Sequence, residues 1–132
     1  MYTASCLCGA IQLKINTEIS KVFVCHCQQC QKAQGSAFVA ISVVRAQDFE
    51  VLSGQEHFGE YYASANKKRV FCKTCASPLY SARLDLPDII RLRVGIINEP
   101  LNAEIASHAF THEKAVWFEI LDDHPKFPKA VC

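Results

Sequence analysis

The sequence has 132 residues, a formal net charge of +1 and 50% hydrophobic residues. This length suits one domain over residues 1–132, large enough to bury a core without metal, and the near-neutral charge argues against a nucleic-acid-binding surface. No apolar run is long enough to cross a bilayer, and residues 1–8 show no basic region followed by an apolar core, so we expect a cytoplasmic protein without a secretory signal.

Short apolar or alternating runs, typical of β-strands, recur along the chain. In chain order, the predicted strands are residues 11–15, 22–24, 38–44, 49–52, 58–62, 69–72, 79–83, 89–97 and 105–110. One short helix is predicted over residues 28–34, because good helix formers there meet Gly35, a common helix stop. Residues 122–128 contain two prolines and are expected to run over the surface. The pattern predicts a mainly β, antiparallel, barrel-like or sandwich-like fold.

Seven of the eight cysteines fall into three tight groups. The groups are Cys6 with Cys8, then Cys25, Cys27 and Cys30, then Cys72 with Cys75. Clustered cysteines in a protein without an export signal bind metal or catalyse more often than they form disulfides. Side chains two apart on an extended segment point the same way, and a C-x-x-C turn can bring two thiolates to one zinc ion. The eighth cysteine, Cys132, is expected to be a bystander.

Groups of two, three and two thiolates divide most naturally into a set of four and a set of three. The four, Cys6, Cys8, Cys72 and Cys75, would fill every position of a structural zinc. The three, Cys25, Cys27 and Cys30, would hold a second zinc with one position open, as catalytic zinc requires. Other divisions stay open at this point, including one four-cysteine zinc plus free thiols. Disulfides are less favoured because they are rare in a reducing compartment. A redox C-x-x-C is less favoured because no βαβ pattern surrounds either copy.

The five histidines do not show a metal-ligand spacing. His26 lies between Cys25 and Cys27 and is expected to point away from them, hydrogen-bonded on the opposite face of its strand. The others could each supply a fourth ligand in principle, but their spacing to the cysteines predicts nothing specific; they are His57, His108, His112 and His124.

Four motifs, taken together and in order, resemble the glutathione-dependent formaldehyde-activating enzyme family, which also includes centromere protein V. The motifs are Ser5-Cys6-Leu7-Cys8-Gly9, the segment 25–38 with its C-H-C-x-x-C, the segment 71–79 with F-C-x-x-C-x-S-P-L, and a closing Ser107-His108 with 114–117. The resemblance covers nearly the whole chain. The chain departs from the family pattern at Gln31, where Arg is common, at Ala76, where Gly is frequent, and at Val116, where Pro is usual.

The resemblance implies a β-tent fold and the same division of the cysteines into a structural and a catalytic zinc site. It also implies membership of the carbon–sulfur lyases, with the joining of formaldehyde to glutathione as the named activity. The partner expected is therefore a small-molecule thiol such as glutathione, with neither nucleic acid nor membrane, and a homodimer is plausible for a small sheet protein with edge strands.

Two hypotheses for function follow. The first is a zinc-dependent carbon–sulfur lyase acting on a thiol adduct; the second is a zinc-stabilised binding module without turnover. For the lyase, Arg91 and Arg93 are candidates to hold substrate carboxylates, because they share a face if their segment is a strand. Lys67, Lys68, Arg69 and Arg83 are more simply a solvated face. Ser36, Phe38 and Trp117 are candidates to line the open zinc site, although large apolar residues are more often core.

Overall fold

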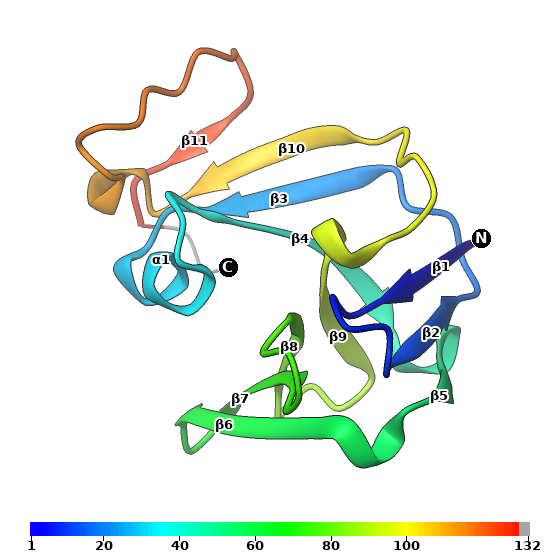
Figure 1. Cartoon of the computed structure of the whole chain (residues 1–132). Coiled ribbons are helices and arrows are strands. Elements are labelled where there is room, and N and C mark those ends of the chain that lie inside the picture. The colour runs from blue at the N-terminus through cyan, green and yellow to red at the C-terminus, as the bar shows by residue number, and fades with distance from the viewer. Residues whose placement is uncertain (130–132) are drawn as a thin grey trace. The chain divides into compact units, whose positions relative to one another are not determined.

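The computed structural model describes residues 1–129 and contains two compact units (Figure 1). The first unit comprises Met1–Glu18 and Ser42–Leu101; the second comprises Ile19–Ile41 and the chain from Asn102 onward. The mainly β class and the single short α-helix are confirmed. Cys132 lies outside the described residues. Within them, no helix has the length and apolar character that crossing a bilayer requires.

The first unit carries antiparallel strands in two groups. The strands β1 (Tyr2–Ser5), β2 (Gln12–Ile15) and β5 (Phe49–Ser53) form a three-stranded sheet in that order. The strands β6 (Phe58–Ser64), β7 (Lys67–Cys72), β8 (Pro78–Arg83) and β9 (Ile89–Arg93) follow one another as neighbours. Three 3-10 turns complete the unit: η1 (Ala46–Asp48), η2 (Gln55–His57) and η3 (Val94–Ile96).

Apolar side chains from both groups of strands form the core of the first unit. Its buried members are Ala4, Cys6, Ile11, Leu13, Val70, Cys72 and Leu79. Two cysteines thus belong to the core itself, which places a metal-binding candidate at the centre of packing.

The second unit is built on strand β3 (Lys21–Cys25). It pairs in parallel with β10 (Glu104–Ala109) and antiparallel with β4 (Val39–Arg45), whose last residues belong to the first unit. The two-residue strand β11 (Lys126–Phe127) adds to β10, also in parallel. The helix α1 (Gln28–Gln34) follows β3, and the turn η4 (Thr111–Glu113) follows β10.

The structure differs in two details from the expected antiparallel, barrel-like or sandwich-like fold. The sheets are not closed into a barrel, and the pairings of β10 with β3 and β11 are parallel. Local sequence patterns report the alternation of side chains, which is the same in both kinds of ladder. The strand predicted over 89–97 is also shorter, because β9 ends at Arg93 and η3 replaces its second half, where Gly95 weakens extended structure.

The helix occupies the predicted residues, and its two ends explain why. The Cys27 side chain caps the N-terminus by accepting a hydrogen bond from the Cys30 N–H, and Gly35 closes the C-terminus in the left-handed conformation with φ 61°. The cap means that one cysteine of the second group is held at the first turn of α1 and another lies inside that turn.

Substituting Gly54 tests how tightly the first unit packs. Gly54 has φ +88°, and a Cβ there would collide with the backbone of Ala10 and Ile11. Gly35 also has positive φ, but a Cβ there meets nothing within 4 Å. We expect Gly35→Ala to lower the free energy of unfolding by about 1 kcal/mol from the backbone conformation alone, and Gly54→Ala by clearly more. Urea unfolding of the two variants checks this, and equal losses would contradict it.

Candidate metal centres

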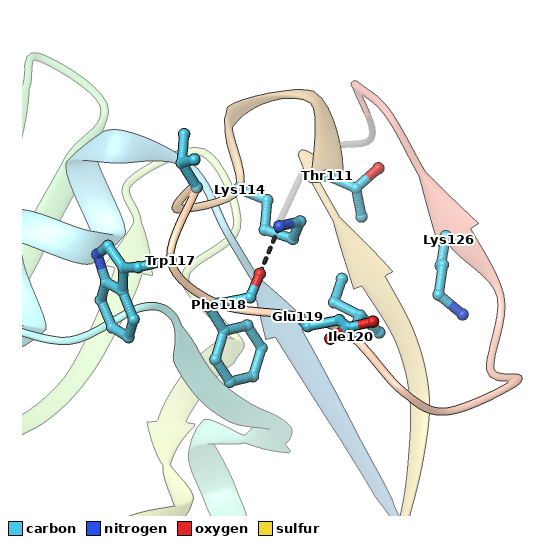
Figure 2. A pocket seen from close by; sticks show the side chains of 8 residues that line it. Thr111, Lys114, Trp117, Phe118, Glu119, Ile120 and Lys126 are labelled. Atoms are coloured by element: carbon cyan, nitrogen blue, oxygen red, sulfur yellow. Dashed lines mark hydrogen bonds between the residues drawn. The ribbon is translucent and has the colours of Figure 1, made fainter.

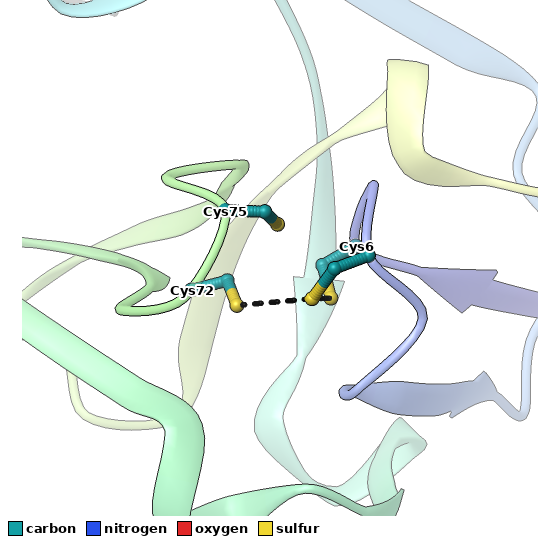
Figure 3. Close-up of side chains that lie close together, drawn as sticks. Cys6, Cys72 and Cys75 are labelled. Carbon is teal, nitrogen blue, oxygen red and sulfur yellow. Dashed lines mark hydrogen bonds between the residues drawn. The ribbon is translucent and has the colours of Figure 1, made fainter.

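Four cysteines from distant parts of the first unit bring their sulfur atoms together. Cys6, Cys8, Cys72 and Cys75 place all four Sγ atoms within 4.8 Å of one another. Figure 3 shows Cys72 and Cys75 reaching from the β7–β8 turn toward the loop that follows β1, which carries Cys6. The spacing between Cys8 and Cys72 in the chain is 64 residues, so this is a long-range junction.

Backbone hydrogen bonds shape both cysteine loops. The Gly9 N–H donates to the Cys6 carbonyl at 3.1 Å, which curls the first loop. The Ala76 N–H donates to the Cys72 carbonyl at 2.7 Å, which forms the second. Ser77 links the loops, because its Oγ accepts from the Leu7 N–H at 2.8 Å and lies 3.3 Å from the Cys75 sulfur. The sulfur positions are therefore imposed by the backbone.

The sulfur spacing fits a tetrahedral zinc ion. Four sulfurs at the usual Zn–S distance of about 2.3 Å lie roughly 3.8 Å apart along each edge of the tetrahedron. The Cys6–Cys8 and Cys8–Cys72 sulfur separations are 3.6 and 3.9 Å. Four soft thiol donors with two of them, Cys6 and Cys72, fully buried also match a closed structural site.

The thiols of this cluster resist ionising together. Hydrogen bonding from Ser77 lowers the pKa of Cys75 to about 5. For Cys8, a backbone hydrogen bond from Ala10 lowers the pKa. The loss of solvent and the neighbouring thiols outweigh this effect and raise the pKa of Cys8 to about 11. Four thiolates this close need a compensating cation, and zinc supplies one.

Ala76, one of the departures from the family pattern, has a backbone conformation that glycine favours. Its φ is 66°, in the left-handed region that glycine favours. Glycine, the residue frequent in the family at this position, adopts this conformation without steric cost, whereas alanine is strained by it while keeping the C-x-x-C turn.

The second unit holds three converging thiols. The sulfurs of Cys25, Cys27 and Cys30 lie within 4.8 Å of one another, and no fourth histidine, cysteine or carboxylate of residues 1–129 joins them. Cys25 sits at the end of β3, with Ala109 beside it on β10 and Val39 on β4. These thiol donors suit zinc, as those of the first cluster do, but they provide three ligands in place of four.

Gln31 and Glu113 tie the helix to this cluster. The Gln31 side-chain amide donates to the His26 carbonyl at 2.7 Å and to the Glu113 carbonyl at 3.0 Å. The Glu113 carboxylate in turn accepts from the Gln28 N–H at the start of α1, at 3.0 Å. Gln31, which stands where Arg is common in the family, therefore fastens the peptide between Cys25 and Cys27.

Three polar side chains form a hydrogen-bonded series that begins at His26, the residue between Cys25 and Cys27 in the sequence. His26 Nε2 lies 2.8 Å from His108 Nδ1, and His108 Nε2 lies 2.8 Å from Asp122 Oδ2. Both rings are buried. Burial lowers the pKa of His26 to about 4, with the charges of His108 and Lys114 acting in the same direction. A hydrogen-bonded His26 was expected; its partner is 82 residues away, and sequence carries no signal that would have identified it.

Phe38 and Trp117 occupy different environments in the second unit. Phe38 packs against His26 and Phe118, with ring centroids 5.7 and 5.4 Å away. Trp117 is 77% exposed and is one of the residues that line an open pocket (Figure 2). The residues that line the pocket are Thr111, Lys114, Val116, Trp117, Phe118, Glu119, Ile120 and Lys126. Ser36 is exposed just after α1.

Lys114 shapes the wall of this pocket. Its Nζ donates to the carbonyls of Ala115 and Phe118, which curls the loop that carries Trp117. Phe118, which lines the pocket, lies with its ring centroid 6.1 Å from that of His26. The pocket therefore approaches the three-cysteine segment through one aromatic ring.

The arginines predicted to bind substrate belong to the first unit. Arg93 is buried, and its Nη1 donates to Ser81 Oγ at 3.0 Å and to the Arg91 carbonyl at 3.2 Å. Arg91 is half-buried on the same strand. The bond to Ser81 joins β9 to β8, so Arg93 has a structural part in the sheet whatever else it does.

The remaining histidines have partners other than the thiols. His57 Nδ1 lies 2.9 Å from Thr74 Oγ1, beside the C-x-x-C turn. His112 Nδ1 contacts the Pro128 carbonyl. His124 donates its backbone N–H to Asp122.

Comparison with known proteins was made with both sequence and fold. The sequence profile of the glutathione-dependent formaldehyde-activating enzymes matches residues 1–113. The chain belongs to this family. A Schizosaccharomyces pombe protein, named as an uncharacterized lyase, is 38% identical over 81 residues, which are 61% of this chain and 57% of that protein. The chain thus spans little more than half the length of that relative.

A crystal structure of a Rhodobacter sphaeroides protein has a similar fold. Its TM-score is 0.62 at 23% identity, covering 74% of this chain and 89% of that one. At this identity the likeness concerns the fold alone. It places the chain among solved structures whose backbone follows the same path over most of their length.

Replacing Ala76 by glycine should stabilise the protein. The change removes the strain of the left-handed conformation at φ 66°. Glycine also makes the unfolded chain more flexible, which offsets part of this stabilisation. We therefore expect an increase of up to about 1 kcal/mol in the free energy of unfolding. Ala82→Gly in β8 is the matched control and should destabilise by about 1 kcal/mol. A loss of stability in Ala76→Gly would show that the methyl group contributes packing that outweighs the strain.

Removing one ligand of the four-cysteine cluster should cost both metal and stability. We expect Cys72→Ser to lose one zinc ion per chain and more than about 3 kcal/mol of unfolding free energy, because this site joins distant parts of one unit. Elemental analysis and thermal unfolding of protein purified without chelator measure both. An unchanged zinc content in Cys72→Ser would contradict a structural site at these residues.

Proposed function

We propose that the protein is a zinc-dependent carbon–sulfur lyase that forms or cleaves a thiol adduct such as S-hydroxymethylglutathione. The observation that supports this most directly is the three-thiol cluster of Cys25, Cys27 and Cys30, which no fourth protein donor of the described residues completes. A protein that needed only structural zinc would gain by filling that position. An incomplete set leaves room for a substrate atom.

The local structure of the three cysteines is compatible with an open metal site. The Cys30 N–H donates to the Cys27 sulfur at 3.3 Å, which holds this sulfur at the N-terminus of α1. Cys25 and Cys30 are buried, so the half-buried Cys27 marks the side from which a ligand would approach. A zinc ion held by these three thiolates would supply the means to keep a substrate thiol ionised, since the negative ligand set weakens it as a Lewis acid for an aldehyde.

Family membership and the lyase name of the yeast relative agree with this chemistry. The pocket beside Phe118 would receive the body of the substrate, with Trp117 among its lining residues and Phe38 behind Phe118. We further propose Ser36 as a polar contact for the substrate, because it is exposed directly after α1. Arg91 and Arg93 stay predictions as carboxylate-binding residues, and the burial of Arg93 favours Arg91 of the two.

Cys27→Ser tests the proposal. We expect it to reduce turnover of S-hydroxymethylglutathione by at least about a hundredfold, since it removes one ligand of the open site. Unfolding free energy should change by less than about 1 kcal/mol, because Cys27 is only half-buried. The readouts are formaldehyde release, zinc per chain and urea unfolding.

Two outcomes would count against the lyase. Loss of the fold in Cys27→Ser would make the second cluster structural. Full zinc content in the wild type without any thiol–aldehyde turnover would favour a zinc-stabilised binding module. Cys8→Ser is the matched control for losing a partly exposed ligand, because it alters the other cluster.

A further inference from the structure

The Asp122–His108–His26 chain ends on an atom that the protein does not satisfy. His26 is 0% exposed, and its Nδ1 finds no hydrogen-bond partner in the part of the chain that the structure describes. A buried polar atom left unpaired lowers the stability of the protein, so such atoms usually meet a water or a ligand. Within the motif C-H-C-x-x-C this atom belongs to the residue between two of the proposed zinc ligands.

The carboxylate of Asp122 sets the direction of the two hydrogen bonds that join Asp122, His108 and His26. Burial acts against ionisation, but the bonds from His108 and from the His124 N–H hold the pKa of Asp122 below its usual value. As an acceptor, Asp122 Oδ2 requires the His108 proton on Nε2. With one proton on each ring, His108 Nδ1 then accepts from His26 Nε2–H. His26 Nδ1 is left as a bare acceptor.

We propose that Asp122 and His108 are positioning residues that fix the tautomer of His26, so that His26 Nδ1 accepts a hydrogen bond from the hydroxyl group of the bound thiol adduct. The ligand part of this inference rests on the proposed function. The tautomer part does not, because it follows from the three side chains alone. The inference concerns which nitrogen of each ring carries the proton.

The surroundings of His26 favour a ligand at Nδ1. Phe38 and Phe118 pack beside its ring, with centroids 5.7 and 6.1 Å away, and Phe118 also lines the open pocket. Aromatic walls exclude competing water, so one hydrogen bond there contributes more to binding than it would in solvent. The hydroxymethyl group of the adduct is the donor that the proposed substrate would bring.

Asp122→Asn should reverse the direction of the hydrogen bonds that join Asp122, His108 and His26. Asp122 Oδ1 accepts from the His124 backbone N–H at 3.0 Å and lies 3.6 Å from Lys126 Nζ. Neither group can become an acceptor, so the oxygen of the substituted amide stays on that side and its NH₂ faces His108. An imidazole can change tautomer, and His108 Nδ1–H would then donate to His26 Nε2. His26 Nδ1 would carry a proton and become a donor.

Nitrogen-15 NMR of histidine-labelled, zinc-loaded protein reports each ring nitrogen directly. In the ligand-free wild type, we expect His26 Nδ1 to resonate as an unprotonated nitrogen and Nε2 as a protonated one. In Asp122→Asn the two should exchange, while Asp123→Asn, the same change at the exposed neighbour, should leave the spectrum as in the wild type. A role in folding alone would not exchange them.

A protonated His26 Nδ1 in the wild type, or a doubly protonated His108, would overturn the tautomer inference. So would an unchanged His26 spectrum in a folded Asp122→Asn variant. If that variant fails to fold, the wild-type spectrum still decides the question. Neither measurement needs turnover, so failure of the lyase proposal leaves this test intact.

Two ligands test the hydroxyl contact. Glutathione with formaldehyde provides the hydroxymethyl adduct, and S-methylglutathione lacks the hydroxyl. We expect only the first to shift the His26 Nδ1 resonance, and Asp122→Asn to weaken its binding at least about tenfold while S-methylglutathione binds unchanged. Equal effects on both ligands, or a His26 resonance that neither ligand moves, would overturn the contact. Absence of binding by either ligand would count against the proposed function as well.

Discussion

Four thiols held within 4.8 Å of one another are the constraint on which the first unit depends. Thiolates repel at this distance, and neutral thiols gain little from meeting, so a bound cation would stabilise the arrangement. Its members come from the loop after β1 and from the turn between β7 and β8, and two of them lie in the apolar core. A metal ion held by these four thiols would join two distant segments of the chain, so metal binding would be coupled to core packing in this unit.

The second cluster has the same type of donor atom but contains three thiols. Its three thiols converge at the junction of β3 and α1, where a strand end and a helix cap fix two of them before any metal arrives. Gln31 and Glu113 fasten the peptide around them. A set prepared by the backbone and left one donor short is the form that zinc chemistry on a substrate requires, since pre-organisation removes the cost of assembling the site at each turnover.

The aromatic and imidazole side chains around the second cluster link it to the open pocket. Phe118 belongs to the pocket and to the packing around His26, and Lys114 holds its loop in place through backbone carbonyls. A ligand in this pocket would lie against an apolar wall with a polar chain, His26–His108–Asp122, behind it. Burying such a series of polar groups costs free energy unless each group is oriented to form its hydrogen bond. The carboxylate of Asp122 at one end therefore affects which nitrogen of His26, at the other end, carries a proton.

Sequence alone determined the cysteine groups, the helix over 28–34, most strand positions and, through four ordered motifs, the family. These features are local: alternation, caps and C-x-x-C turns are set by neighbours in the chain. The division of the cysteines into four and three was a hypothesis from counting, and the structure brings those same sets together. Only the tertiary structure decided the parallel pairing of β3 with β10, because a strand's pattern does not name its partner. Likewise, only folding brought His108 and Asp122 to His26 and turned Arg93 inward, since these contacts depend on strand register over tens of residues, which no local pattern encodes.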